Sequence, residues 1–363
     1  MGKLTRRQVL VAGGGILTAA VAGAVAWRRE SGSMAEYESY SSALRTAPAP
    51  VAADLVRYAT LAANGHNTQP WRFHMGNDEI RLLPDFGRRT PVVDPDDHHL
   101  FVSLGCAAEN LAIAAAATGR PCEADFDSGD GLRFRFGAGA ARPHPLFDAI
   151  PRRQSTRARY DGRSVPNRDL DMLMQAGKLP GVRLVMLTDR LRIGQVRDLA
   201  VAGNGAQLAD PAFVAELKRW LRFNPRAAMT RGDGLFSACT GNPVMPEWLG
   251  RRAFDLFFTA QSENDKLARQ IDSSSGIAVF VGERADRAHW ITVGRACQRF
   301  MLTATCLGLK CAFINQPVEV APLRASLANL VGETGKRPDL VLRFGYGPAM
   351  PYAPRRSVET VVV

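Results

Sequence analysis

The chain has 363 residues, of which 46% are hydrophobic and 22% are charged. This is the composition of a folded globular protein, and the length allows two domains or one large domain built from two halves. The net charge is +11 at pH 7, but arginines are spread along the whole chain without a run of five like charges, so we expect no nucleic-acid partner. The six cysteines form no Cys-x-x-Cys pair, and neither a Gly-x-Gly-x-x-Gly fingerprint nor a P-loop occurs. These patterns argue against a zinc ribbon, a thioredoxin-like centre and a Rossmann-type nucleotide site, and we expect no metal site.

The first 26 residues are typical of a targeting segment. Arg6 and Arg7 are followed by an uncharged stretch from Val9 to Trp27, and Ala24-Val25-Ala26 is a small-residue cleavage pattern. This arrangement resembles a twin-arginine export signal, which implies the twin-arginine (Tat) translocation machinery as a partner. The alternative is an uncleaved anchor at the cytoplasmic membrane, because about 20 apolar residues span a bilayer. If the signal is not used, the protein stays cytoplasmic. Residues 27–50 are rich in Ser, Pro and Ala and are predicted to be a linker or extended arm.

The remaining chain mixes predicted helices and strands. Hydrophobic periodicity and turn residues predict helices over about 51–63, 167–175, 191–201 and 252–271, and strands over 71–74, 80–83, 182–187 and 277–281. Residues 204–250 contain many Gly, Pro and Asn and no sustained period, so they are predicted to be a long functional loop or lid. The intermixed pattern fits an α+β or α/β protein, and we expect the α+β class.

Part of the sequence occurs twice. Residues 97–122 match residues 286–311 at an offset of 189, and the apolar positions predict one buried helix in each copy, followed by a strand. Residues 132–137 match residues 340–345 in the same order, and both look like strands that close a sheet. The two matches predict an ancestral homodimer fused into one chain, with halves at 51–150 and 151–363. The identities in the first match are Asp97/Asp286, Gly105/Gly294, Ala107/Ala296, Ala115/Ala304, Gly119/Gly308 and Cys122/Cys311.

Residues 64–73, Asn-Gly-His-Asn-Thr-Gln-Pro-Trp-Arg-Phe, join a predicted helix to a predicted strand. Gly and Pro restrict the backbone of this loop, and its Asn and Gln side chains offer hydrogen-bond donors and acceptors. Here the sequence resembles the nitroreductase family of FMN proteins, in which a loop ending in Asn-x-Gln-Pro-Trp lies against the flavin. The resemblance implies that the cofactor is bound by Asn64, Gly65, Asn67 and Gln69. The alternative is an ordinary helix–strand turn with a core tryptophan.

A second motif, Arg-Arg-Gln-Ser-Thr-Arg-Ala-Arg, lies at residues 152–159. Alternate positions offer a guanidinium, a hydroxyl and another guanidinium, which suit the oxygens of a phosphate. The nitroreductase family carries Arg-x-Ser-x-Arg/Lys here, so the resemblance implies that Arg153, Ser155 and Arg157 bind the flavin phosphate, ribityl chain and ring edge. The alternative is a solvated basic loop.

Two weaker matches lie near the C-terminus. Arg355 and Arg356 follow the last predicted strand, where the family places basic residues near the same phosphate; the alternative is an exposed basic tail. Asn315 and Gln316 follow the second repeated helix and its strand, where the family places backbone amides against the flavin ring.

The resemblance covers about residues 51–363 and fits the double-length, Acg-like branch of the family. The first half holds the Gln-Pro-Trp loop and lacks Arg-x-Ser-x-Arg, while the second half holds Arg-x-Ser-x-Arg and reads Gly-Lys-Leu-Pro-Gly at 177–181 in place of the loop. Because family homodimers build each flavin site from both subunits, the resemblance implies a nitroreductase-like fold with one composite FMN site, in a monomer that acts as a pseudo-dimer and can assemble further.

The resemblance also implies the chemistry. NAD(P)H would be a transient reductant, and a quinone or a nitroaromatic-like small molecule would be the electron acceptor. The cofactor carries the redox step, so no catalytic side-chain nucleophile or general base is expected. The alternative function is a protein that stores or sequesters FMN with little turnover, because both functions need the same contacts.

Overall fold

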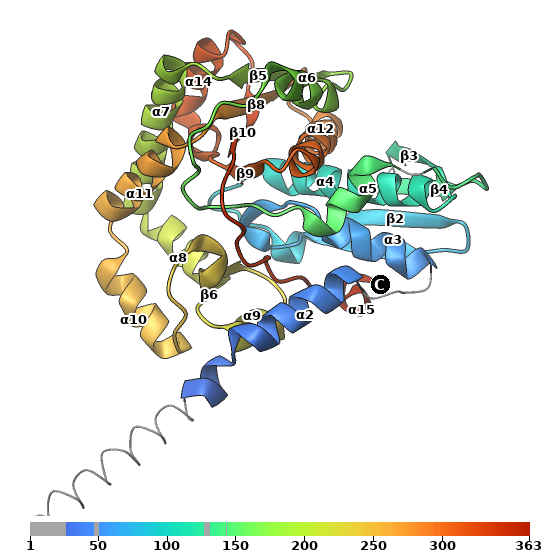
Figure 1. The fold of residues 1–363 in the computed structure, drawn as a ribbon, viewed down its shortest axis with the longest axis horizontal. Helices are drawn as coiled ribbons and strands as arrows, with labels where there is room; N and C mark the ends of the chain where they lie inside the picture. Colours follow the sequence, from blue (N-terminus) through green and yellow to red (C-terminus); the bar gives the residue numbers. More distant parts are fainter. Residues whose placement is uncertain (1–26, 47–50, 127–130, 143) are drawn as a thin grey trace, which may run out of the picture.

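Two four-stranded sheets, a two-stranded sheet and the helices packed between and beside them form the described part of the molecule (Figure 1). The computed structural model describes residues 27–46, 51–126, 131–142 and 144–363. The predicted signal or anchor at residues 1–26 lies outside the described residues.

The first sheet has the strand order β1-β2-β4-β3, and all neighbouring strands are antiparallel. Trp71 and Phe73 of β1 are fully buried while Arg72 between them is exposed, because successive side chains of a strand point to opposite faces. Helix α4 packs against β2 and against α3. The elements are α3 (Val51–Thr60), β1 (Trp71–Met75), β2 (Glu79–Pro84), α4 (His98–Ala117), β3 (Cys122–Phe126) and β4 (Leu132–Phe136).

The second sheet has the order β5-β8-β10-β9 and is also antiparallel throughout. Strands β8 and β10 are buried along their whole length, which explains their nearly continuous apolar sequence. The elements are β5 (Val182–Leu187), β8 (Gly276–Gly282), α12 (Arg287–Cys306), β9 (Lys310–Phe313) and β10 (Pro338–Gly345).

The two sheets have the same topology. In each sheet the strands, numbered in chain order, lie in the order first, second, fourth, third, and a 20-residue helix connects the second strand to the third. The register also agrees: Phe136 lies opposite Cys122 in the first sheet, and Phe344 lies opposite Cys311 in the second. These four residues are the ones that the two sequence matches align. The sequence similarity between the halves thus extends to strand order and register.

Helices α4 and α12 cross at two glycines, one from each copy of the repeat. A Cβ atom on Gly105 would overlap the carbonyl oxygen of Ile291, and a Cβ atom on Gly294 would overlap the carbonyl oxygen of Val102. Val102 and Ile291 occupy equivalent positions in the two copies. The crossing therefore looks alike from either helix, and it needs glycine on both sides because no side chain fits between the backbones.

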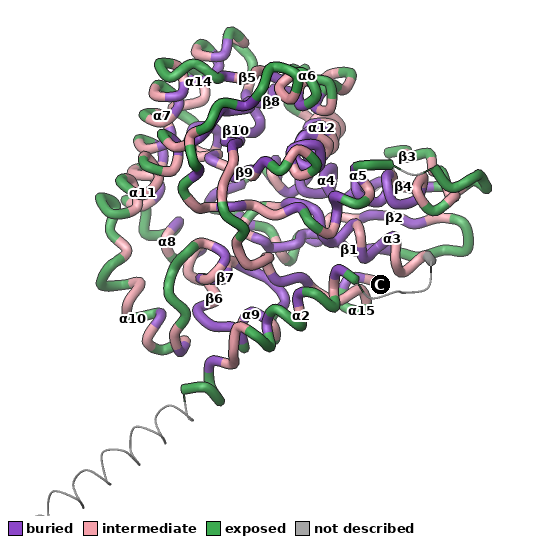
Figure 2. The backbone as a smooth tube through the Cα atoms, viewed as in Figure 1, coloured by how far each residue is buried: buried purple, intermediate pink, exposed green. Residues whose placement is uncertain are grey.

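The halves share one hydrophobic core. Its largest buried cluster includes Phe73 and Phe134 from the first half, and Phe280 and Phe344 from the second. Buried backbone is concentrated in the two sheets and in the helices between them (Figure 2). Among the described residues, α4 is the helix that is long and apolar enough to cross a membrane, and 83% of its apolar window is buried inside the protein. Burial on all sides accounts for its apolar sequence.

The prediction of a linker at residues 27–50 is wrong for the described part of that segment. Residues 27–31 are helical, and α2 (Met34–Thr46) follows. Tyr37, Ser41 and Arg45 recur every four residues and form the buried face of α2. The Tyr37 ring centroid lies 4.6 Å from that of Phe236, so contacts with a distant segment, which composition does not report, stabilise this helix.

The prediction of an irregular lid at residues 204–250 is also wrong. This region is mostly helical because Pro211 and Pro225 occupy first-turn positions, preceded by the capping residues Asp210 and Asn224. The predicted helix at 252–271 is two helices, with Thr259 capping the second. The elements are α7 (Arg190–Ala209), α8 (Pro211–Trp220), β6 (Leu221–Arg222), α9 (Pro225–Arg231), β7 (Leu235–Phe236), α10 (Glu247–Phe257) and α11 (Ala260–Asp272).

Short helices complete the described fold. They are α5 (Pro145–Ala149), α6 (Asn167–Ala176), α13 (Gln316–Glu319), α14 (Arg324–Leu330) and α15 (Val358–Val361). The C-terminal strand ends at Gly345, and the chain then returns to the first half, where Val362 forms a bridge with Phe73 of β1.

The glycine crossing predicts a specific loss of stability. Gly105→Ala and Gly294→Ala should each lower the free energy of unfolding by about 1–3 kcal/mol or more, because the added methyl group forces the two helices apart. Urea unfolding measures this change. The matched control is Gly194→Ala in α7, where a Cβ atom would meet only the Arg197 Nη2 atom, at 3.8 Å. That control should be neutral or gain up to about 1 kcal/mol from helix propensity. Equal effects at all three glycines would contradict the close crossing.

Candidate functional site

A cavity of about 320 Å³ lies between the two halves. The first half contributes residues 63–66 and the first two turns of α4. The second half contributes Arg157 and residues 312–316, which run from β9 into α13. Helices α7, α8, α10 and α11 cover the cavity. Their apolar residues that line it are Leu208, Phe213, Leu217, Phe254 and Leu267, and Phe258 joins them from the turn between α10 and α11.

A smaller cavity of about 50 Å³ adjoins the first and has a different chemistry. Ala63, Asn64 and Arg157 line both cavities. The other polar residues that line the smaller one include Arg45, Asn67, Arg153, Ser155 and Arg355. The structure therefore brings together the two motifs that the sequence placed in different halves.

Four arginines surround the smaller cavity, and in the described part of the chain none of them forms an ion pair with a carboxylate. Arg153 donates through Nη2 to the Leu61 carbonyl oxygen at 3.1 Å, but its buried Nε and Nη1 atoms have no partner among the described residues. The Nε atoms of Arg45 and Arg355 are also buried and also have no hydrogen-bond partner among the described residues. Arg157, the fourth, faces both cavities.

The energetics of this arginine cluster favour an anion. Burial, followed by the like charges of Arg153 and Arg45, lowers the pKa of Arg355 to about 9. Burial also lowers the pKa of Arg45 to about 10, and it lowers the pKa values of Arg153 and Arg157. A buried charge without a counter-charge is destabilising, so an anion with several oxygens, such as a phosphate, is the ligand that satisfies the free N–H groups.

The backbone of the Asn64–Gln69 loop is strained. His66, Asn67 and Gln69 have φ values of 46°, 53° and 53°, in the left-handed region that side chains disfavour. Two side chains of the loop hold this conformation: Asn64 Oδ1 accepts from the Gln69 backbone at 2.9 Å, and Asn67 Nδ2 donates to Gly234 and Pro354, each at 3.0 Å. Strain that its surroundings enforce is typical of a ligand-binding loop. A Cβ atom built on Gly65 would have no described atom within 4 Å, so the backbone there is open to the cavity.

The Arg153–Arg157 loop is fixed from the second sheet. The backbone N–H of Thr156 donates to the Cys311 carbonyl of β9 at 2.8 Å. The fully buried Arg343 of β10 donates to the carbonyl oxygens of Thr156 and Ala158, at 3.2 and 2.8 Å. These hydrogen bonds fix the backbone at Thr156 and Ala158, on both sides of Arg157. The Arg157 side chain therefore extends toward the cavities from a fixed backbone segment.

Asn315 and Gln316 line the larger cavity, and their contact with the flavin ring stays a prediction. Asn315 Oδ1 accepts from the Val341 backbone at 2.9 Å, which joins this segment to β10. The Oε1 atom of Gln316 is buried without a partner among the described residues, so it is free to accept a bond from a ligand.

Gln69 and Arg356 line neither cavity. Gln69 is fully buried; its Nε2 donates to Gly232 at 2.7 Å and its Oε1 accepts from the Arg356 backbone at 2.9 Å. Arg356 Nη2 donates to the Thr360 carbonyl at 2.6 Å. In this structure the two residues hold the loop against the C-terminal segment. Their predicted contact with the cofactor is therefore replaced by a positioning contact.

Sequence reasoning missed Arg45. It lies in α2, inside the segment predicted to be a linker, and its guanidinium lies 4.0 Å from the centroid of the Tyr352 ring. The i, i+4, i+8 spacing of Tyr37, Ser41 and Arg45 was the available signal, since three polar residues in one helical register can share a face.

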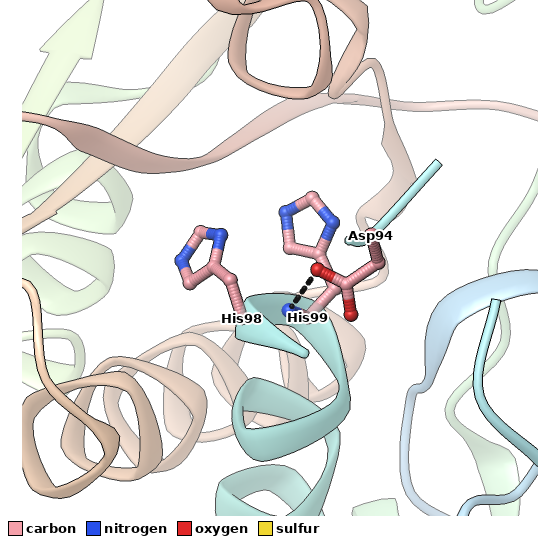
Figure 3. A group of neighbouring side chains, drawn as sticks. All are labelled: Asp94, His98 and His99. Atoms are coloured by element: carbon pink, nitrogen blue, oxygen red, sulfur yellow. Dashed lines mark hydrogen bonds between the residues drawn. The ribbon is translucent and has the colours of Figure 1, made fainter. Parts of the chain in front are cut away.

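Asp94, His98 and His99 lie together at the start of α4 and place potential ligand atoms within 4.8 Å of one another (Figure 3). Each of these side chains also contacts other parts of the protein. Asp94 accepts from the backbone N–H groups of His99 and Leu100, at 3.0 and 2.9 Å, and so completes the N-terminus of α4. His98 Nε2 contacts Asp339 at 2.8 Å, and its Nδ1 contacts Arg337 at 3.2 Å. The cluster is therefore a structural junction between the start of α4 and the segment around β10.

Comparison with curated proteins finds relatives along most of the chain. The chain is 27% identical over 317 residues, 84% of its length and 88% of the relative, to a Mycobacterium tuberculosis protein named "Putative NAD(P)H nitroreductase Rv3131". It is 24% identical over 327 residues, with 84% and 93% coverage, to another from the same species named "Putative NAD(P)H nitroreductase acg". These relatives support the resemblance to nitroreductases. No family model matches the chain.

Solved structures give weaker likenesses. A nitroreductase with bound FMN from Bacteroides fragilis matches at a TM-score of 0.35 with 15% identity, covering 57% of this chain and 90% of that chain. The FMN-dependent nitroreductase NfnB from Mycobacterium smegmatis, in complex with NADPH, matches at 0.36 with 11% identity, covering 56% and 87%. Scores this low do not establish a shared arrangement of elements, so the site is interpreted from the residues of this chain.

The larger cavity also predicts a pH effect. Burial and the neighbouring Arg157 lower the pKa of His66 to about 4, below the value near 6.5 of an unfolded chain. Between these values the unfolded state binds the extra proton, so stability falls as the pH falls from about 6.5 to about 4. His66→Asn, which tolerates the left-handed backbone, should show a smaller loss of stability between pH 7 and pH 5 in urea unfolding. His74→Asn, at an exposed position of β1, should behave as the wild type, and equal losses in all three proteins would refute this assignment.

Proposed function

We propose that this protein is an FMN-dependent oxidoreductase of nitroreductase type. The observation that carries the proposal is the junction of two contrasting cavities. A cluster of arginines that has no carboxylate partner among the described residues opens onto a larger cavity that is bordered by the strained Asn64–Gln69 loop. FMN combines the two matching chemistries, a phosphate dianion and a flat ring system.

The residues present fit this cofactor. Arg45, Arg153 and Arg355 offer unpartnered Nε atoms, and Arg153 an unpartnered Nη1, to a phosphate, and Ser155 lies beside them. The larger cavity, at about 320 Å³, lies within the range of small-molecule and cofactor sites. Its edge offers the open backbone at Gly65 and the free Oε1 atom of Gln316 to a polar ring.

Bound FMN would supply hydride transfer, from NAD(P)H to a quinone or nitroaromatic-like acceptor. The chain's own residues would bind the cofactor, orient it and shield it from water. Arg157, at the junction of the cavities, supplies a positive charge that favours an anionic ligand. The apolar side chains of α8, α10 and α11 exclude water from the larger cavity. His66 remains neutral at pH 7, because burial keeps its pKa near 4, and adds no charge there.

We also propose that the chain is a fused pseudo-dimer with one composite FMN site. The common strand order, the equivalent register and the glycine crossing support this origin. One copy supplies the Asn64–Gln69 loop and the other supplies the Arg153–Arg157 loop. The second half has Gly-Lys-Leu-Pro-Gly at 177–181, so we expect no second site and one FMN per chain.

The phosphate contacts predict a matched pair of variants. Arg153→Gln should raise the dissociation constant for FMN by about 100-fold or more, because removing one partner of a buried charge pair costs about 3–5 kcal/mol. Arg152→Gln, at the adjacent but exposed arginine, should keep full affinity. Flavin fluorescence titration of each protein after removal of bound flavin measures the constants. Equal affinities of the two variants would remove the phosphate assignment.

The alternative function is storage of FMN with little turnover. It is motivated by helices α7, α8, α10 and α11, which cover one side of the larger cavity. Anaerobic mixing of the flavin-loaded protein with NADH or NADPH separates the two functions. For an oxidoreductase, the flavin absorbance should bleach within seconds, and addition of a quinone or nitroaromatic compound should restore it. Unchanged absorbance with both reductants would favour storage. The same spectrum, divided by protein concentration, should give one flavin per chain.

A further inference from the structure

Helix α10 exposes large apolar side chains to solvent. Leu256 and Phe257 are 72% and 74% exposed, and Trp248, two turns earlier, is 56% exposed. We call these three residues the α10 patch. Contiguous apolar surface on a monomer marks an interaction site when polar residues border it, whereas single exposed apolar residues need no explanation.

The same helix covers the larger cavity with its other face. Phe254 and Phe258 line that cavity, and their rings stack at a centroid distance of 4.1 Å. Gly250 packs against the Phe223 ring, which fixes the start of α10 on the body of the protein. At 3.6 residues per turn, Trp248 and Leu256 lie on the same outer side of α10, whereas Phe257, the last residue of the helix, lies on the opposite side from Trp248 and is exposed at the helix end.

Basic residues border the α10 patch. Arg251 and Arg252 are exposed on α10 itself, and Arg226 and Arg231 are exposed on the neighbouring α9. The acidic residues of α10 are already paired: Asp255 contacts Lys218, and Glu247 lies 3.7 Å from Arg251. The charges on α10 itself therefore cancel, and the positive charge near the patch, which suits a negatively charged partner, comes from Arg226 and Arg231 of α9.

The described chain begins at the same end of the molecule. A Cβ atom on Gly32 would lie 3.1 Å from the backbone nitrogen of Arg226, at the start of α9. The preceding Asn224 donates to Met245, and Phe223 donates to Glu247 of α10, at 3.4 and 3.1 Å. The first described helical turn and α10 accordingly lie at the same end of the ribbon (Figure 1). The 26 residues that precede Trp27 in the sequence include the uncharged stretch that starts at Val9.

We propose that this end of the protein docks on an anionic membrane surface through the α10 patch. An apolar surface that carries Trp, Leu and Phe, bordered by arginines, is the composition of a helix that lies in the headgroup region of a bilayer. Each arginine near an anionic lipid surface adds attraction, which salt weakens. The proposal concerns a surface of the protein and does not depend on bound FMN.

The test reports contact at Trp248 itself. The full-length chain is mixed with vesicles of phosphatidylglycerol and dibrominated phosphatidylcholine, whose bromines quench tryptophan fluorescence on contact. Quenching should be strong at low salt and weaker at high salt, and Trp248→Phe should remove most of the quenchable signal. The double variant Leu256→Glu/Phe257→Glu should lose most of the quenching of Trp248.

The matched control is Leu191→Glu, since Leu191 is 75% exposed at the start of α7 and lies by the end of α11 that is farther from α10. This variant should be quenched as the wild type is. A vesicle-bound chain with unquenched Trp248 would show that residues 1–26 alone hold the membrane, and would overturn the proposal. So would a lipid-free dimer that the double variant converts to a monomer, because a second copy of the chain would then be the partner of the patch.

Discussion

The close crossing of α4 and α12 is the contact on which the rest of the structure depends. It joins two sheets of equal topology into one core, and it is possible only because Gly105 and Gly294 lack side chains. Val102 and Cys106, which contact α12 at this crossing, also line the larger cavity. The separation of the two helices therefore sets the shape of the cavity, and a change at the crossing reaches the site directly.

The arginine cluster is the second constraint, and it acts across the whole chain. Arg45 comes from α2, Arg153 and Arg157 from the loop before α6, and Arg355 from the segment after β10. Their mutual repulsion opposes folding unless an anion is bound, so ligand binding and stability are linked. The arginine cluster forms only when the chain folds and brings together segments some 300 residues apart in the sequence. The proposed cofactor would hold these segments together as well as carry electrons.

The sequence predicted the regular elements well where a periodic pattern was complete. The strand at 182–187 has the predicted bounds, the strand at 71–74 is one residue longer at one end, and the strands at 80–83 and 277–281 are one residue longer at both ends. The prediction of an irregular lid was wrong because Asp210, Pro211, Asn224 and Pro225 begin helices there. The same residue types end helices elsewhere, and only the packing of the following turn distinguishes the two cases.

The sequence by itself determined the two internal matches, which align Gly105 with Gly294, and the two loop motifs, because each depends on residues close together in the chain or on a comparison of two segments. The tertiary structure decided that the two aligned glycines meet where α4 and α12 cross. Only the tertiary structure decided that the loops share a pair of cavities, that Arg45 joins the cluster, and that Gln69 binds the C-terminal segment instead of the cavity. Those outcomes depend on contacts between residues as many as 315 positions apart, and a local pattern carries no information about which distant groups will satisfy a buried side chain.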